Sequence, residues 1–363
     1  MSSINIVPQN NNLDIVRFTL ASMVFISHAH DLSGLSALAL LSAAVSSTLA
    51  VQAFFIISGF LIFQSFDRSS TLKSYAARRV RRILPAYVVV VISCAVLLGA
   101  LSTLPFGAYV RDPGLWRYLG ANLLFLNFLA PELPGVFQNN LFSAVNGALW
   151  TLKIEVAFYV SVPICVWLCR RYGRDLILVL IYLLSVAYAA GCLWLAETRG
   201  SGAFVELSRQ LPGQMTYFVA GAACYYHFGH LRQRPWLTAA AGLILFGLST
   251  VGLELALRPI GLALLVMGIS FGPFAGRFGR HGDFSYGIYI IHFPVLQTLI
   301  ALGLPSQSPL VFLLVSILAV GTLAFAMWHL VEKRFLRRDS HYRRSARPGA
   351  EPDMSVRGSA MPH

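Results

Sequence analysis

Long apolar segments recur along most of the chain, with short polar segments between them. Ten of these segments are about 17 to 25 residues long, the length that an α-helix needs to cross the roughly 30 Å hydrocarbon core of a membrane. They cover residues 15–31, 48–66, 83–104, 149–169, 176–195, 211–229, 236–253, 258–275, 284–304 and 309–331. The pattern predicts an all-α fold, a polytopic membrane bundle of about ten transmembrane helices.

The composition favours the same fold class. Hydrophobic residues make up 56% of the 363 residues, charged residues only 12%, and the mean hydropathy is +0.67. A soluble domain of this length does not carry so much apolar surface. We expect one membrane domain over 1–335 and a basic, disordered cytoplasmic tail over 336–363. No cleavable signal peptide is expected, and the connection 105–148 is a candidate re-entrant or interfacial segment.

The chain has a formal net charge of +13, and the distribution of this charge is informative. With the N-terminus placed in the cytoplasm, 21 Lys and Arg residues fall in loops on the cytoplasmic side and five on the other side. Cytoplasmic loops are enriched in Lys and Arg, so this bias predicts that both termini are cytoplasmic. Orientation explains the basic surplus, and nucleic acid is not an expected partner. All five cysteines lie in or at the ends of predicted spans, where neither a disulfide nor a metal site is expected.

Three ionisable residues, His28, Glu155 and His292, lie inside apolar segments. An ionisable group near the membrane centre costs at least ~2.5 kcal/mol, so it is kept there only if it is paired, hydrated or functional. His28 lies eleven residues after Arg17, about 16 Å further along a helix. The histidine either packs against a neighbouring helix through a hydrogen bond or acts as a general base. Glu155 is either neutral and hydrogen-bonded, or paired with Arg17 or a histidine.

Further polar positions have two interpretations each. Ser58 and Gly59 either let two helices approach closely or line a passage for an extended ligand. Arg79 and Arg82 share a helix face and either anchor the topology or hold phosphates. Pro85 is expected in the first turn of the span that follows them. The polar stripe on the ninth span normally faces the bundle interior and comprises Ser285, Tyr289 and His292.

Six segments in this order resemble the membrane acyltransferase-3 family of bacterial O-acyltransferases, which modify exopolysaccharides, O-antigens, Nod factors and some antibiotics. The resemblance covers nearly the whole chain. The segments are LDIVRFTLASMVFISHAH with Arg17 and His28, FFIISGFLI, RRVRRILPAY, LWTLKIEVAFY with Trp150 and Glu155, FSYGIYIIHFPV, and WHLVEKRF with Glu332. Arg78 and Arg81 have the same spacing as Arg79 and Arg82, but the family pattern through Ile83 and Pro85 favours the latter pair.

The resemblance implies an activity in the bacterial inner membrane. An acyl group, most often acetyl, would move from cytosolic acyl-CoA to a hydroxyl of an extracytoplasmic or lipid-linked glycan, with no permanently bound cofactor. His28 would be the base or an acyl relay, with Glu155 as a second catalytic residue. Arg79, Arg82 and Ser58 would contact the donor, whereas Arg17, Trp150, Tyr289 and His292 would contact substrate. Because the appended esterase-like domain of some members is missing, direct transfer is expected.

A secondary transporter or glycan flippase is the competing hypothesis, since transporters also keep His and Glu near the midplane. Such proteins often contain two related halves, and no internal repeat is visible in this sequence. A cytosolic arginine pair suited to an anionic cofactor is also unexplained by transport. The resemblance therefore favours the enzyme.

Overall fold

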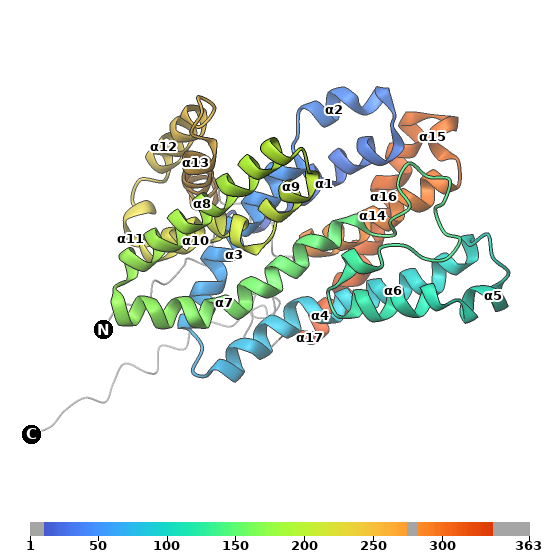
Figure 1. Ribbon diagram of the computed structural model, residues 1–363, viewed down its shortest axis with the longest axis horizontal. Coiled ribbons are helices and arrows are strands. Elements are labelled where there is room, and N and C mark those ends of the chain that lie inside the picture. Colours follow the sequence, from blue (N-terminus) through green and yellow to red (C-terminus); the bar gives the residue numbers. More distant parts are fainter. Residues whose placement is uncertain (1–10, 274–281, 337–363) are drawn as a thin grey trace, which may run out of the picture.

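The computed structural model describes residues 11–273 and 282–336 and contains only helices and loops in these two ranges. Each predicted apolar segment overlaps a helix, although the bounds differ by several residues at some ends (Figure 1). These helices are α1 (Leu13–Ser33), α3 (Ser47–Asp67), α4 (Leu72–Leu97), α7 (Trp150–Tyr172), α8 (Arg174–Arg199), α10 (Leu211–Tyr226), α12 (Pro235–Leu248), α13 (Glu254–Ser270), α14 (Ser285–Ala301) and α16 (Pro309–Met327). The predicted tail lies outside the described residues except for Leu336.

Shorter elements connect these helices. The α-helical ones are α2 (Ala39–Ala43), α5 (Phe106–Arg111), α6 (Pro113–Leu123), α9 (Gly202–Ser208), α11 (Phe228–Leu231), α15 (Leu304–Gln307) and α17 (Lys333–Phe335). Single 3₁₀ turns are η1 (Ser36–Leu38), η2 (Leu98–Leu101), η3 (Asn127–Leu129) and η4 (Gly147–Leu149), and η6 (Trp328–Glu332) is a π-helical turn.

Five helical segments in the described part of the chain are long and apolar enough to cross a membrane. They are Ser36–Asp67, Leu72–Leu101, Gly147–Tyr172, Arg174–Arg199 and Pro309–Phe335. Large apolar side chains project outward from them, such as Leu184 on α8 and Leu318 on α16, which are 70% and 68% exposed. Extensive apolar surface of this kind is suited to contact with lipid.

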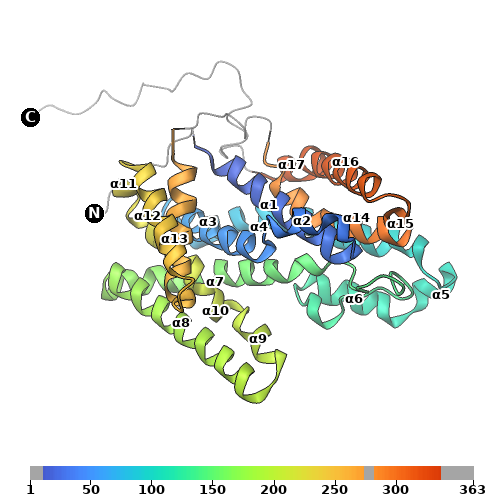
Figure 2. The same ribbon diagram turned by 90° about the horizontal axis from the view of Figure 1, so that it is seen from above.

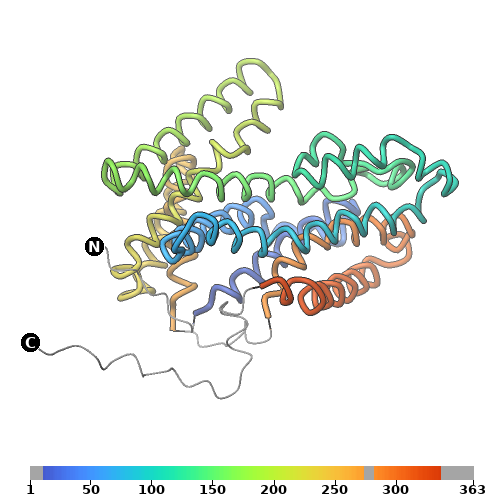
Figure 3. Tube along the Cα trace, turned by 90° about the horizontal axis from the view of Figure 1, so that it is seen from below, coloured from blue at the N-terminus to red at the C-terminus, as the bar shows by residue number. Residues whose placement is uncertain are grey.

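The N-terminal helices lie in the middle of the bundle. Seen from above, α1 and α3 lie between α8 and α9 on one side and α16 on the other (Figure 2). The view from below shows the same arrangement, with the blue helices between green and red ones (Figure 3). Arg17, His28 and Ser58 are therefore on helices that other helices surround.

Helices α1 and α14 pack side by side and run in the same direction. Arg17, near the start of α1, pairs with Asp283, just before α14, and His28 pairs with His292 further along both helices. The two pairs are separated by eleven residues of α1, which is about 16 Å. The parallel contact thus creates two polar sites at different depths of the bundle.

Helix α4 begins at Leu72, eleven residues before the predicted start at residue 83. The side chain of Thr71 caps the helix by accepting a hydrogen bond from the Ser74 N–H at 3.1 Å. The expected position of Pro85 in the first turn is therefore wrong, because Pro85 lies inside the helix. A proline inside a helix removes one backbone hydrogen bond, which membrane helices tolerate. The arginines before it are consequently held by a helix rather than by a loop.

The connection 105–148 forms α5, α6 and a loop that is attached to α14. Gln297 is fully buried and donates to the carbonyl oxygens of Phe142 and Ala144 at 2.6 and 2.8 Å. Asn146 donates to the Ile290 carbonyl at 2.8 Å. These bonds fix the loop against the part of α14 that carries His292.

Replacing Gly59 with alanine is expected to destabilise the fold severely. A Cβ atom on Gly59 would lie 1.9 Å from the Phe218 carbonyl oxygen of α10, and backbone cannot move aside cheaply. The close-packing interpretation therefore applies to this glycine, and overpacking costs ~1–3 kcal/mol or more. Thermal unfolding in detergent measures the loss. The control is Gly191→Ala on α8, where a Cβ meets nothing within 4 Å, and equal stability of the two variants would contradict this account.

Candidate active site

Two histidines meet between α1 and α14. The Nδ1 atom of His28 lies 2.8 Å from Nε2 of His292, and the two rings are nearly parallel with centroids 5.1 Å apart. His292 is fully buried, whereas His28 is only partly buried. Of the two side chains, His28 is therefore the one that a substrate can reach.

The backbone fixes which nitrogen atoms carry protons. The Nδ1 atom of His292 lies 3.1 Å from the Ile288 carbonyl oxygen, which only accepts, so this nitrogen is the donor. In a neutral His292 the Nε2 atom is then an acceptor, and His28 must donate its Nδ1 proton to it. A neutral His28 consequently keeps its lone pair on Nε2, the form that a general base requires.

A polar stripe on α7 extends from this histidine pair toward the arginines. Thr151, Glu155 and Tyr159 are spaced four residues apart and share one helix face. The Thr151 hydroxyl lies 2.8 Å from the Tyr289 hydroxyl, and the Tyr289 ring centroid is 6.0 Å from that of His292. The stripe and α14 thus connect the histidines to the middle of the bundle.

Glu155 accepts hydrogen bonds from two hydroxyl groups. The donors are Ser58 of α3 at 3.3 Å and Tyr159 at 2.7 Å. Of the alternatives that the sequence left open, the structure shows hydrogen bonding rather than an ion pair with Arg17 or a histidine. Glu155 does not touch the histidine pair, so an orienting contact to an imidazole is not present in this structure.

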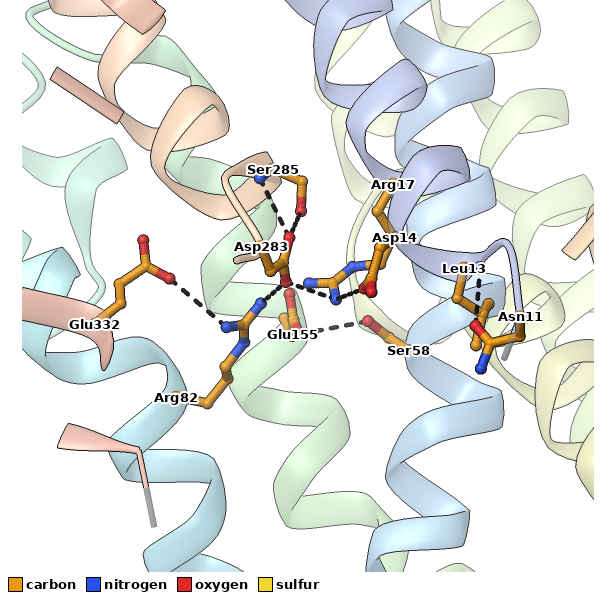
Figure 4. Close-up of polar contacts among 10 residues, drawn as sticks. All are labelled: Asn11, Leu13, Asp14, Arg17, Ser58, Arg82, Glu155, Asp283, Ser285 and Glu332. Atoms are coloured by element: carbon orange, nitrogen blue, oxygen red, sulfur yellow. Dashed lines mark hydrogen bonds and ion pairs between the residues drawn. The ribbon is translucent and has the colours of Figure 1, made fainter. Parts of the chain in front are cut away.

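Five ionisable side chains form a second site at the start of α1 and α14, namely Asp14, Arg17, Arg82, Asp283 and Glu332 (Figure 4). The Asp283 Oδ2 atom accepts from Arg17 at 2.7 Å and also from Arg82, while its Oδ1 atom accepts from the Ser285 N–H at 3.2 Å. Arg82 also lies 3.6 Å from Glu332, which the π-helical turn presents. Only 1% of the Asp283 side chain is exposed. This carboxylate therefore joins α1, α4 and α14.

The charge state of Asp283 follows from its neighbours. Burial raises the pKa of the carboxyl group, but the guanidinium groups of Arg17 and Arg82 lower it by more. The net result is a pKa well below the usual range, so Asp283 is a carboxylate at neutral pH.

Arg79 has different surroundings from Arg82, three residues later. Its Nη2 atom donates to the Ser65 hydroxyl at 3.1 Å, and its guanidinium group lies 5.7 Å from the Tyr159 ring centroid. Among the described residues no carboxylate lies within ion-pair distance of Arg79, and its buried Nε atom has no hydrogen-bond partner. This guanidinium group is available to an anion.

The pair Arg78 and Arg81 has the same spacing as the pair Arg79 and Arg82, but the two pairs have different surroundings. Arg81 is exposed, and Arg78 donates to the Ser69 hydroxyl at 2.5 Å on the connection before α4. Arg79 and Arg82 instead turn toward the polar interior, as their contacts show.

The predicted site residues thus fall into three groups rather than one. Arg17 and Arg82 lie at the charged site, Ser58 and Glu155 lie in the middle, and His28, Tyr289 and His292 lie at the other end. Trp150, the first residue of α7, is partly buried against the core. The described residues contain no group of three His, Cys, Asp or Glu side chains that could hold a metal ion.

Sequence analysis missed three residues of these groups. Thr151 and Tyr159 were recognisable from their four-residue spacing around Glu155. Asp283 was recognisable as a lone carboxylate directly before an apolar segment, at the level where the first segment carries Arg17. Each signal requires neighbouring helices to be aligned in depth, which the segment boundaries alone do not provide.

Comparison with known proteins places this arrangement in a family. The family model described as an acyltransferase domain matches residues 10–331. An O-acetyl transferase of Shigella phage Sf6 is 27% identical over 92% of this chain and 98% of its own length. Nodulation protein 10 of Rhizobium leguminosarum bv. viciae is 29% identical over 89% of this chain and 92% of its own.

A shorter match is to acyltransferase MdmB of Streptomyces mycarofaciens, 29% identical over 37% of this chain and 32% of its own length. No solved structure matches the chain. The family model covers most of the residues, including every candidate site residue from Arg17 to His292. The chain therefore belongs to the acyltransferase-3 family.

Proposed function

We propose that this protein is an integral membrane O-acyltransferase that moves an acyl group, most often acetyl, from cytosolic acyl-CoA to a hydroxyl of an extracytoplasmic or lipid-linked glycan. The main support is the series of polar side chains that leads from Arg79 along α7 and α14 to His28. Arg79 suits the phosphates of a CoA donor, and the Nε2 atom of His28 suits a hydroxyl acceptor. The names of two relatives, an O-acetyl transferase and an acyltransferase, favour the same reaction.

The proposed topology has ten crossings in the inner membrane of a bacterium, with both termini in the cytoplasm. The bias of 21 basic residues against five supports this orientation. The parallel contact of α1 and α14 supports the count, since these helices are the first and ninth crossings and odd-numbered crossings run the same way. Arg79 and Arg82 then lie toward the cytosol and the donor, and His28 lies toward the outer face and the acceptor.

The proposed reaction uses His28 as the base. Its Nε2 atom takes the proton of the acceptor hydroxyl while the hydroxyl oxygen attacks the thioester carbonyl carbon. The carbon–sulfur bond breaks, and the imidazolium returns the proton to the CoA sulfur, which leaves as the thiol. His292 stabilises the imidazolium by accepting its Nδ1–H bond, because a hydrogen bond from a charged donor is the stronger kind.

A relay through an acyl group on His28 Nε2 would use the same nitrogen and the same partner. In that variant the Nε2 atom of His28 attacks the thioester carbonyl carbon, the carbon–sulfur bond breaks, and CoA leaves as the thiolate. The acceptor hydroxyl then attacks the acyl carbon of the acyl-imidazolium and the carbon–nitrogen bond breaks. The hydroxyl proton goes to the thiolate, so that the products are the ester, neutral His28 and the CoA thiol. Both routes need the Nε2 lone pair, so the arrangement of the two histidines supports acyl transfer by either one.

Analysis of the glycan tests the proposal. Surface and lipid-linked glycans from cells with and without the gene are compared by NMR and mass spectrometry, before and after mild alkali. We expect an alkali-labile ester, most often acetyl, that disappears when the gene is deleted and returns on complementation. Purified protein in nanodiscs should transfer radiolabelled acetyl from acetyl-CoA to the glycan that lacks this ester. If no ester depends on the gene, the acyltransferase proposal fails.

A further inference from the structure

The two arginines that point into the bundle from α4 have different partners. Arg82 contacts the Asp283 carboxylate and the Glu332 side chain, whereas the contacts of Arg79 in the described part of the chain are to a hydroxyl group and an aromatic ring. A phosphate that bound Arg82 would have to compete with the Asp283 carboxylate already in place. A phosphate that bound Arg79 would compete with no carboxylate among the described residues.

Asp283 is fixed on both of its oxygen atoms. Oδ1 is held by the first turn of α14 through the backbone N–H of Ser285, and Oδ2 is held by Arg17 of α1 and by Arg82. A side chain with 1% exposure and four hydrogen-bond donors around it cannot rotate freely. The position of α14 relative to α1 is therefore set at this point.

The same two helices carry the histidine pair. Arg17 and His28 are on α1, while Asp283 and His292 are at the start of α14 and within it. The 2.8 Å contact between the imidazoles requires the two helices to keep their register, because a shift of 1 Å along the axis would lengthen or misalign it.

We propose that the paired arginines divide their work: Arg79 contacts the phosphates of the acyl-CoA donor, whereas Arg82 and Arg17 hold Asp283 as a positioning residue that keeps His292 behind His28. This inference rests on the proposed function and refines its donor site. It removes Arg82 from the donor contacts that the sequence assigned to the pair, and it gives Arg17 a structural partner instead of a substrate.

Donor binding and turnover, measured separately, test the division. Acetyl-CoA binding to the purified full-length protein in nanodiscs is measured by calorimetry, and turnover by acetyl release to the acceptor glycan. Arg79→Gln should weaken acetyl-CoA binding about tenfold or more with a smaller effect on turnover at saturating donor. Asp283→Asn should change the dissociation constant less than about threefold and lower turnover at least tenfold. Arg81→Gln, the exposed neighbour, is the matched control and should change neither quantity.

The double variant distinguishes positioning from direct phosphate contact. Arg82→Gln alone leaves Asp283 with one arginine fewer, and Arg82→Gln with Asp283→Asn removes one positive and one negative charge together. We expect the double variant to bind acetyl-CoA as the unaltered protein does, and to lose less turnover than the product of the two single losses.

Two results would overturn the inference in distinguishable ways. If Arg82→Gln weakens acetyl-CoA binding as much as Arg79→Gln, or if Asp283→Asn tightens it by releasing Arg82, the division of labour is wrong and the proposed function stands. If the unaltered protein binds no acetyl-CoA, the proposed function fails and this inference fails with it.

Discussion

Replacing His28 with alanine is expected to abolish acyl transfer while acetyl-CoA still binds. The contacts of His292 with the backbone and with His28 leave the basic lone pair of the histidine pair on Nε2 of His28. General-base catalysis contributes about 10²–10⁴-fold to a rate. Both the direct route and the acyl relay lose their acting nitrogen. Turnover with radiolabelled acetyl-CoA and calorimetric binding of the same donor measure the two effects separately.

His30 provides the matched control for this experiment. It lies two residues later on the same helix, and its Nδ1 atom faces the Leu35 carbonyl oxygen at 3.1 Å rather than another imidazole. His30→Ala should leave turnover within a few-fold of the unaltered protein. An His28→Ala protein that is well folded and still transfers acetyl at the normal rate would exclude His28 as base and as relay.

Replacing His292 is expected to lower turnover with one substitute and largely preserve it with another of similar size. His292→Leu removes the acceptor for the Nδ1–H of His28, whereas His292→Gln keeps an oxygen acceptor in the same region. A hydrogen bond to a charged group is worth ~1.5–3 kcal/mol, which corresponds to a rate loss of about tenfold to 150-fold. We expect that loss in the leucine variant and substantial retention in the glutamine variant.

The measurement for His292 separates a positioning role from a structural one. The turnover number should fall in His292→Leu while the KM for acetyl-CoA and the thermal midpoint stay close to those of His292→Gln. If both variants lose activity equally and unfold at equally lowered temperatures, the residue only fills space between α1 and α14. Because the His292 side chain is fully buried, the two substitutions leave the exposed surface of the site unchanged.

The sequence was sufficient to predict that each apolar segment forms a helix, and it provided the candidate site residues. Each apolar segment became a helix because an 18-residue apolar run has few alternatives once its backbone must satisfy its own hydrogen bonds. His28, Glu155 and His292 were selected as candidates because an ionisable side chain in an apolar run is costly. Helix starts were less predictable, since the start of α4 depends on the cap at Thr71 and not on hydropathy.

The pairing of the polar residues was not predictable from one sequence. Arg17 and Arg82 both fit a donor site by charge, and only the position of Asp283 between them shows that they share a carboxylate. The partners of Glu155 likewise depend on which face of α3 meets α7. Such contacts are set by the relative depth and rotation of helices, which a hydropathy pattern does not determine.

The histidine pair can form only late in the synthesis of the protein. Its two members are 264 residues apart, and α14 is among the last helices to leave the ribosome. Domains and helices inserted earlier can pack as they emerge, but this contact waits until nearly the whole chain has been translated and inserted. Chains that stop before α14 therefore contain His28 without its partner, and the proposed reaction would have to wait for that helix.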